Sequence, residues 1–252
     1  MRLKGKKALV TGAGGGIGSA VACCFASEGA ELILSDRHAA DCAAVAETIR
    51  NGGADPMVAA ADVTIEDEIR ELYEKIEEVH ATLDVVVNIA GGDLEPVRDI
   101  NDLGYDGMSG NIDLNLKSCM LSCREACRIM RPENYGRIIN MSSLVYRGSQ
   151  GQFSYSAAKG GIFSFTRSLA MAMGPYNITA NALAPALVDV PVFKRVLGEK
   201  RWKALAEDAA RCYPMQRIAS PDDVARAALF LASDDASFIT GQILEISGGA
   251  RL

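Results

Sequence analysis

Histidine is scarce in this chain of 252 residues, which contains only His38 and His80. Chemistry that depends on a histidine pair or on a histidine-rich zinc site is therefore nearly excluded. Basic charge is also in short supply, with 26 Lys and Arg against 32 Asp and Glu and a formal net charge of −6. Nucleic-acid coats and membrane-surface binders need basic patches. We therefore expect no metal, no nucleic-acid partner and no membrane association.

A continuous apolar segment without glycine is missing as well. Residues 8–27 carry no charge and follow three lysines, which superficially resembles a signal sequence or a membrane span. An insertion helix would not be built around the five glycines of this segment, which are Gly12, Gly14, Gly15, Gly16 and Gly18. We therefore expect a soluble, cytoplasmic protein.

The seven cysteines form no regular disulfide framework. Cys119, Cys123 and Cys127 recur at i, i+4 and i+8, which is one stripe of a helix. We interpret them as reduced cysteines that serve as small apolar residues in a cytoplasmic protein. A thiolate metal site on the stripe is the poorer alternative, because no histidine neighbours it.

Short apolar runs alternate with longer helical patterns along the whole chain. Strands are predicted at 7–11, 31–35, 56–60, 83–88, 136–142, 178–182 and 243–246. Helices are predicted at 17–29, 39–51, 66–79, 111–131, 155–173 and 221–233, and irregular stretches at 91–110, 144–154 and 186–220. This alternation predicts an α/β fold, a three-layer doubly wound parallel sheet (Rossmann-like) of about seven strands with helices on both faces. Residues 1–252 are expected to form a single domain.

A glycine-rich turn joins the first predicted strand to the first predicted helix. Its spacing is Gly-x-x-x-Gly-x-Gly over 12–18, rather than the commoner Gly-x-Gly-x-x-Gly. Glycines let the backbone approach a pyrophosphate closely, and the helix N-terminus presents unpaired N–H groups and partial positive charge to it. The residues predicted to line this dinucleotide site are Gly12, Gly14, Gly16, Ile17 and Gly18.

Acidic residues follow the second and third predicted strands. A carboxylate at Asp36 can accept hydrogen bonds from an adenosine ribose and would repel the 2′-phosphate of NADP, which favours NAD. Arg37 is the counter-evidence, since a guanidinium can receive a phosphate. Asp36 as a helix cap is the structural alternative. Asp62 and Val63 are expected to contact the adenine, whose amino group Asp62 could recognise. A helix N-cap role for Asp62 is an almost equally favoured alternative.

Tyr155 and Lys159 lie four residues apart at the start of a predicted helix. That spacing puts the phenol and the ammonium on one face, with Cβ atoms about 5–6 Å apart. A cation there would lower the pKa of the Tyr155 phenol from about 10 toward working pH. Such a tyrosine can exchange a proton with an alcohol or a carbonyl oxygen.

These motifs together resemble the classical short-chain dehydrogenase/reductase family, and in particular its 3-oxoacyl-carrier-protein reductases. The resemblance covers essentially the whole chain. Besides the glycine turn and Tyr155/Lys159, it rests on Asn88-Ile-Ala-Gly91, Asn115, Ser142-Ser143, Asn181-Ala-Leu-Ala-Pro185 and Ile239-Thr-Gly through Gly249.

The resemblance implies roles for particular residues. Asn115 would support a water in a proton relay, Tyr155 would be the general acid/base, and Lys159 would lower its pKa and hold the nicotinamide ribose. A serine would polarise the substrate oxygen. The further residues that it implies at the cofactor are Asn88, Ala90, Gly91, Pro185 and Val188.

Two serines compete for the catalytic position. Counting along the strand from Gly136 selects Ser143, whereas counting back from Tyr155 by the commonest family spacing selects Ser142. Ser143 is preferred, because side-chain alternation fixes strand register while the following loop can lose a residue. The chain also departs from the family pattern at three positions, which are Ile89, Ala186 and Val190.

Substrate identity is weakly encoded. Residues 186–214 correspond to the family's substrate-covering region, and 93–98 are a candidate opposite wall. The covering segment is rich in basic side chains, either to attract an anionic substrate or, as the favoured interpretation, to form a solvated helix face. Lys194, Arg195, Lys200, Arg201 and Lys203 are those side chains.

The expected function is an NAD-dependent oxidoreductase, with NADP less favoured, that interconverts a secondary alcohol and a ketone as its small-molecule substrates. One alternative is an NADPH-dependent carbonyl or 3-oxoacyl reductase on the same scaffold. The other is a non-catalytic dinucleotide-sensing protein. Helices at about 111–131 and 155–174 are apolar on more than one face, and in the family such helices form subunit contacts. A homotetramer is therefore expected, with a deeper monomer core as the alternative.

Overall fold

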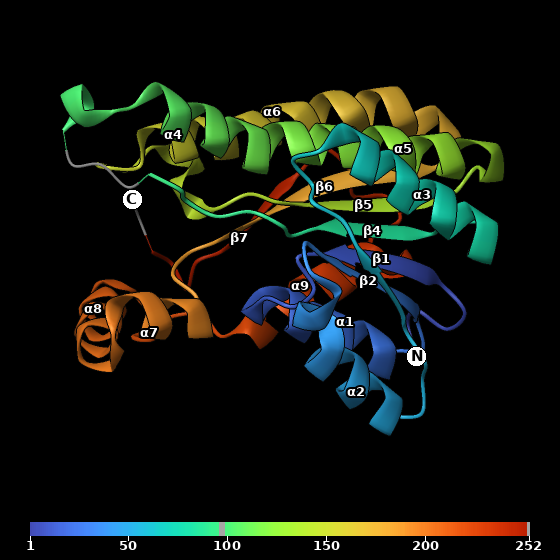
Figure 1. Ribbon diagram of the computed structural model, residues 1–252, viewed down its shortest axis with the longest axis horizontal. Coiled ribbons are helices and arrows are strands. Elements are labelled where there is room, and N and C mark those ends of the chain that lie inside the picture. Colours follow the sequence, from blue (N-terminus) through green and yellow to red (C-terminus); the bar gives the residue numbers. More distant parts are fainter. Residues whose placement is uncertain (96–98, 251–252) are drawn as a thin grey trace.

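Seven parallel strands form one twisted sheet at the centre of the molecule (Figure 1). The computed structural model describes residues 1–95 and 99–250. The strands are β1 (Lys7–Thr11), β2 (Glu31–Asp36), β3 (Met57–Ala60), β4 (Val85–Asn88), β5 (Gly136–Met141), β6 (Ile178–Pro185) and β7 (Ile243–Ile246). Their order is β3-β2-β1-β4-β5-β6-β7, and every neighbouring pair is parallel. The predicted doubly wound sheet of about seven strands is confirmed.

Helices cover both faces of this sheet (Figure 1). Val10 and Leu34 point to one face, where they pack with α1 (Gly16–Ser27), α2 (Ala43–Asn51) and α9 (Pro221–Ala232). Leu9 and Ile33 point to the other, where they pack with α3 (Glu66–His80), α5 (Ser118–Glu133) and α6 (Phe153–Met173). Strands between two helical layers bury both faces, which explains why β4 and β6 are buried along their whole length.

The sheet reverses its winding direction between β1 and β4. From β1 the chain winds outward to β2 and β3, then returns to β4 on the other side of β1 and winds away through β7. The loops after β1 and β4 therefore diverge at the carboxyl ends of the strands, which is where open α/β sheets bind ligands. The predicted cofactor residues end or follow strands at this edge, begin α1 or lie on α6.

The predicted helix over 111–131 is interrupted. It consists of α4 (Tyr105–Asn111), a π-helical turn η3 (Ile112–Lys117) and α5. Single π-turns insert a residue into a helix and are frequent at functional sites. Asn115 lies in this turn. Periodicity misses such a defect, because it changes the twist of the helix without breaking its apolar pattern.

The prediction that 186–220 is irregular is wrong. The segment contains α7 (Pro191–Leu197) and α8 (Glu199–Cys212), which lie apart from the sheet in Figure 1. Gly198, at φ +80°, separates the two helices. α7 is only seven residues long and buries no side chain, whereas α8 is amphipathic and fully buries Trp202, a pattern that the sequence-based prediction overlooked. Short helical turns also occupy parts of the other two stretches, at Ile100–Asp102, Tyr105–Asn111 and Leu144–Arg147.

The cysteine stripe faces the interior. Cys119, Cys123 and Cys127 are at most 8% exposed and belong to the core between α3, α5 and α6. Their use as small apolar residues is confirmed. Across the ranges 1–95 and 99–250, three or more His, Cys, Asp or Glu side chains nowhere gather closely enough to hold a metal ion. Over those same ranges, every helix is too short or too polar to cross a membrane.

Candidate active site at the carboxyl edge of the sheet

The glycine turn packs too tightly for any side chain at three of its positions. Gly12 has φ +66°, and a Cβ there would lie 2.9 Å from the Ala90 nitrogen. A Cβ at Gly14 would lie 2.5 Å from the Asp41 carbonyl oxygen, and one at Gly18 would overlap the Gly12 carbonyl oxygen. The first turn of α1 contains no acidic residue, so its unpaired N–H groups and helix dipole remain suited to an anion. The backbone thus fits the diphosphate of a dinucleotide.

Asp36 lies beside this turn at the end of β2. Its Oδ2 accepts a hydrogen bond from the Gly14 N–H (3.0 Å), and its Oδ1 accepts one from the Arg37 N–H (2.8 Å). The carboxylate is therefore fixed toward the turn, while Arg37 is exposed. The Asp36 carboxylate keeps further acceptor capacity, which suits the hydroxyls of a ribose.

Asp62 and Val63 follow β3. Asp62 Oδ1 accepts hydrogen bonds from the N–H (2.9 Å) and the hydroxyl (2.7 Å) of Thr64, which lower the pKa of the Asp62 carboxyl. These bonds form a local turn and do not cap α3, since the N-cap of that helix is Ile65. The helix-cap alternative for Asp62 is therefore wrong.

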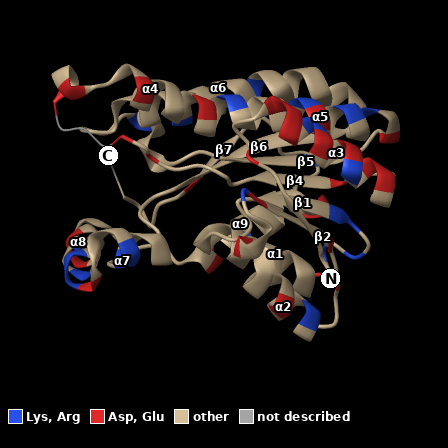
Figure 2. Ribbon diagram, in the orientation of Figure 1, with Lys and Arg blue, Asp and Glu red and all other residues tan. Residues whose placement is uncertain are grey.

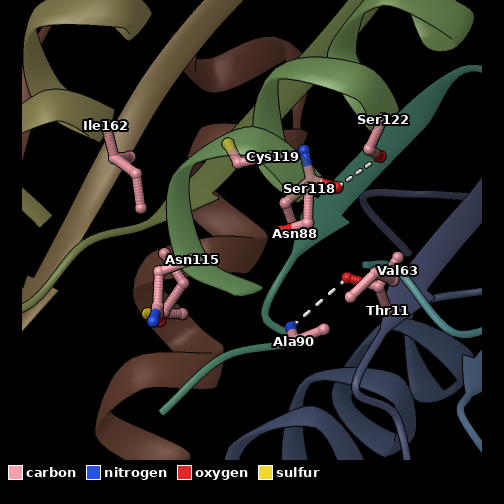
Figure 3. Close-up of a pocket in the computed structure, with 10 residues that line it drawn as sticks. Thr11, Val63, Asn88, Ala90, Asn115, Ser118, Cys119, Ser122 and Ile162 are labelled. Carbon is pink, nitrogen blue, oxygen red and sulfur yellow. Dashed lines mark hydrogen bonds between the residues drawn. The ribbon is translucent and has the colours of Figure 1, made fainter. Parts of the chain in front are cut away.

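The turn after β4 is held from β1. Thr11 Oγ1 accepts hydrogen bonds from the N–H groups of Ile89 (3.1 Å) and Ala90 (3.3 Å), the second of which is drawn in Figure 3. The Asn88 side chain turns inward instead. Its Nδ2 donates to Asn140 Oδ1 (2.9 Å), and its Oδ1 accepts from the Ser122 hydroxyl (2.6 Å). The Asn88 amide is thus occupied within the protein, and it shapes the turn that carries Ala90.

Asn115 is clamped to the same loop. Its Oδ1 accepts a hydrogen bond from the Gly92 N–H (3.0 Å), and its Nδ2 donates to the carbonyls of Gly92 (2.9 Å) and Asn111 (3.0 Å). A Cβ at Gly91 would lie 2.6 Å from Asn115 Oδ1 and 3.3 Å from Lys159 Nζ. The loop after β4, the π-turn and α6 therefore meet at Gly91.

A small cavity of about 10 Å³ opens beneath this junction (Figure 3). Such a volume is close to the smallest that holds one water molecule. Thr11, Asn88, Asn115 and Ser122 contribute polar atoms to its wall, and Val63, Ala90 and Cys119 contribute apolar ones.

Tyr155 and Lys159 lie on one face of α6, as their spacing predicts. Lys159 Nζ is 5.4 Å from the centroid of the Tyr155 ring and donates a hydrogen bond to the Met141 carbonyl (2.8 Å). The Lys159 side chain is buried, and burial lowers the pKa of its ammonium to about 8.

The prediction that Lys159 lowers the pKa of the Tyr155 phenol toward working pH is wrong in this structure. Burial of the phenol, reinforced by the negative charge of Asp93, raises the pKa of Tyr155 to about 12, and a hydrogen bond with Ser143 opposes this rise. The spacing of two residues on a helix fixes their separation but not their exposure to water. Desolvation, which the sequence pattern does not show, is the larger effect here.

The two competing serines differ in their contacts. Ser142 is buried, and its hydroxyl donates a hydrogen bond to the Lys159 carbonyl (2.9 Å). Ser143 is partly exposed, accepts a weak hydrogen bond from the Val145 N–H (3.4 Å) and faces the Tyr155 phenol. Ser142 therefore ties β5 to α6, while Ser143 presents its hydroxyl beside the tyrosine.

The remaining predicted residues line the neighbouring edge. Ile17 packs against the core below α1, and Pro185 ends β6. Val188 is buried and forms a bridge with Ala219. Val190 lies against the glycine turn, because a Cβ at Gly16 would be 2.8 Å from its Cγ1.

Sequence reasoning missed three supporting groups, namely the Thr11 hydroxyl, the Asn111 side chain and the Met141 carbonyl. Thr11 ends β1 and Asn111 ends α4, and a polar residue at the end of a strand or helix is a signal that sequence analysis can use. A backbone carbonyl leaves no signal in the sequence.

Titration of Lys159 gives a testable consequence for stability. Between about pH 8 and the ordinary value of 10.5, the unfolded chain binds more protons than the folded protein, so stability rises with pH. Lys159→Met removes this contribution. In denaturant titrations, the free energy of unfolding of wild type should rise by about 1–3 kcal/mol relative to that of the variant between pH 7 and pH 10. The exposed Lys75 supplies the control Lys75→Met, and a pH-independent difference between wild type and Lys159→Met would contradict the buried-amine assignment.

The fold and the edge just described are those of the doubly wound α/β proteins that bind dinucleotides. The family model described as enoyl-(acyl carrier protein) reductase matches residues 12–251. The chain is 35% identical to 3-oxoacyl-[acyl-carrier-protein] reductase FabG of Thermotoga maritima, over 99% of each chain. It is also 35% identical to short-chain reductase protein NovJ of Streptomyces niveus, over 96% of this chain and 92% of the relative. The solved structure of an NAD⁺-bound xylitol dehydrogenase superposes with a TM-score of 0.92 at 28% identity, covering 99% of this chain and all of the other.

The chain belongs to the short-chain dehydrogenase/reductase family.

Proposed function

We propose that this protein is an NAD-dependent oxidoreductase that interconverts a secondary alcohol and a ketone, with Tyr155 as the general acid/base. The observation that carries the proposal is the meeting of Tyr155, Ser143 and Lys159 beside the loop after β4. A nicotinamide cofactor, when bound, supplies hydride transfer. In alcohol oxidation the Tyr155 phenolate takes the hydroxyl proton, and in ketone reduction the neutral phenol gives its proton to the ketone oxygen.

The neighbouring groups have distinct tasks in this proposal. Ser143 donates a hydrogen bond to the reacting oxygen and orients it toward the phenol. The remaining N–H donors of the Lys159 ammonium would hydrogen-bond to ribose hydroxyls of the cofactor. Asn115, held by Gly92 and Asn111, supports the π-turn and the loop after β4. The glycine turn binds the diphosphate through backbone N–H groups.

A screen of alcohols and ketones tests the reaction. Wild-type protein is incubated with NAD and each alcohol, or with NADH and each ketone, and absorbance of the reduced nicotinamide is followed. Turnover of at least one secondary alcohol or ketone is expected. Tight cofactor binding without turnover of any compound would favour the dinucleotide-sensing alternative.

Cofactor preference rests on Asp36. Asp36→Ala removes the carboxylate that faces the glycine turn, so the repulsion of a 2′-phosphate is lost while Arg37 remains. We expect the ratio of kcat/KM for NAD to that for NADP to fall by about 10–100-fold, equivalent to about 1–3 kcal/mol. Asp55→Ala removes an exposed carboxylate that pairs with Arg50, and it serves as the control for net charge. An unchanged ratio would refute the role of Asp36.

A second candidate is the NADPH-dependent reduction of a carbonyl or a 3-oxoacyl thioester. It is supported by the 35% identity to the Thermotoga maritima FabG over nearly the whole chain. The Asp36 carboxylate argues against it, because it would repel the 2′-phosphate of NADPH. Comparison of NADH and NADPH, each with a 3-oxoacyl thioester and with a simple ketone, decides between the two, because only this candidate requires NADPH.

We further propose that residues 186–214 of this single domain cover the substrate. Phe193 stacks on the buried Trp202, with centroids 4.9 Å apart, and Trp202 Nε1 donates to Asp189 Oδ1 (3.2 Å). Basic residues on α7 and α8 have acidic neighbours (Figure 2), including the pairs Lys194–Asp189 (3.3 Å) and Lys203–Glu207 (4.0 Å). These pairs support a solvated helix face over an anion-binding surface.

The same proposal includes a homotetramer built through helices at about 111–131 and 155–174. Met120 on α5 and Met171 on α6 are 42% and 75% exposed. Burial of such side chains between subunits would be favourable. Sedimentation of the wild-type protein measures the assembly.

A further inference from the structure

A carboxylate near Tyr155 accepts hydrogen bonds from its own loop and from two other segments of the chain. Asp93, in the loop after β4, accepts hydrogen bonds on Oδ1 from Asn111 Nδ2 (3.2 Å) and from the Glu95 N–H (3.2 Å). Its Oδ2 accepts a hydrogen bond from Gln152 Nε2 (3.1 Å). Asn111 is fully buried, and its Nδ2 also donates to the Ser154 hydroxyl (2.9 Å).

This arrangement lies between the elements that carry the proposed catalytic groups. Gln152 is the N-cap of α6 and precedes Tyr155 by three residues. Asn111 ends α4, and its carbonyl accepts the Asn115 side chain. The charge of Asp93 reaches Tyr155, because it contributes to the raised pKa of the phenol. Asp93 is partly buried.

The free hydrogen-bonding capacity of the Asp93 carboxylate is that of an acceptor. Each carboxylate oxygen can accept more than one hydrogen bond. The Gln152 amide, which donates one N–H to Asp93, adds an acceptor oxygen and one further N–H beside this charge. A ligand group that meets Asp93 must donate an N–H or O–H, and a carboxylate at that place would be repelled.

We propose that Asp93 and Gln152 form a subsite that selects substrates with a hydroxyl or ammonium group on the carbon next to the reacting one, and that rejects a carboxylate there. The inference rests on the oxidoreductase function proposed above and names its substrate class. An acyl thioester offers no donor to this subsite, so the inference also bears on the choice between the two candidate functions.

The test compares three secondary alcohols of matched length. One carries a neighbouring hydroxyl, one a neighbouring ammonium, and one a hydrogen at that carbon, and a 2-hydroxy carboxylate is added as the anionic member. Wild type should favour the two donor substrates over the plain alcohol by about tenfold or more in kcat/KM, which corresponds to one hydrogen bond to a charged group. The carboxylate should be the poorest.

Two variants assign that preference to the subsite. Asp93→Asn keeps the shape of the side chain and removes its charge, and Gln152→Met removes the amide while keeping its length. In both, the preference for the donor substrates should fall to within about threefold of the plain alcohol, chiefly through KM. Asp93→Asn should penalise the ammonium substrate more than the diol, because only the first loses a charge pair. Asp99→Asn, at an exposed carboxylate that caps a short turn, is the control.

The pH profile supplies a readout that altered packing would not move in this direction. The charged groups near the Tyr155 phenol are Asp93 and the Lys159 ammonium. Removal of the Asp93 charge should lower the pH at which the rate of alcohol oxidation rises. An unchanged donor preference and an unchanged profile in Asp93→Asn would overturn the inference while leaving the oxidoreductase function intact. Failure of wild type to turn over any alcohol or ketone would overturn the proposed function and this inference with it.

Discussion

Tyr155→Phe is expected to lower kcat for alcohol oxidation by about 10²–10⁴-fold, the usual contribution of a general acid/base. The variant keeps the ring, which is largely buried beside Lys159, and loses only the hydroxyl that would carry the proton. Affinity for NADH should change little, since no hydrogen bond from the Tyr155 hydroxyl holds the glycine turn. Steady-state turnover and calorimetric binding of NADH measure the two quantities.

A neighbouring tyrosine supplies the matched control. Tyr146 lies three residues beyond Ser143, and its hydroxyl donates a hydrogen bond to Glu245 Oε1 (2.8 Å). Tyr146→Phe removes an equivalent hydroxyl from the same region and should leave kcat within a few-fold of wild type. If Tyr155→Phe retained near-normal turnover, the assignment of the acid/base would be wrong.

Ser143→Ala is expected to lower kcat by about 10²-fold or more, because a single hydrogen-bond donor to the reacting oxygen contributes this much in other enzymes. Ser143 faces the Tyr155 phenol, so its loss removes both the polarisation of the substrate and a contact that favours the ionised phenol. Turnover of the best alcohol from the screen measures the effect.

Ser142→Ala separates the two serines. Its hydroxyl bonds to the Lys159 carbonyl in the interior, so its removal should cost about 1 kcal/mol of stability and only a few-fold in kcat. Denaturant unfolding and turnover are measured on the same two variants. A larger loss of kcat in Ser142→Ala than in Ser143→Ala would reverse the assignment.

Several features of the site followed from local patterns. The alternation of strands and helices predicted the parallel sheet, and the order of the strands brought the glycine turn, Asp36 and the loop after β4 to one edge. The four-residue spacing of Tyr155 and Lys159 predicted that they share a helix face. These inferences succeed because strand alternation, helical periodicity and turn chemistry are short-range properties.

Other features needed contacts between distant segments. The π-turn carries Asn115, whose side chain hydrogen-bonds to Gly92 in a separate loop, and local periodicity does not report such a contact. The direction of the Tyr155 pKa shift was also missed, since burial outweighs a lysine whose ammonium is held by the Met141 carbonyl.

The sequence by itself determined the fold class, the glycine turn after β1 and the shared helix face of Tyr155 and Lys159, because these depend on residue types at fixed local spacing. Only the tertiary structure decided which serine faces the phenol, where the Asn88 amide points and how Asp93 is held beside the site. Those outcomes depend on burial and on hydrogen bonds between residues far apart in the chain, which desolvation and packing set together.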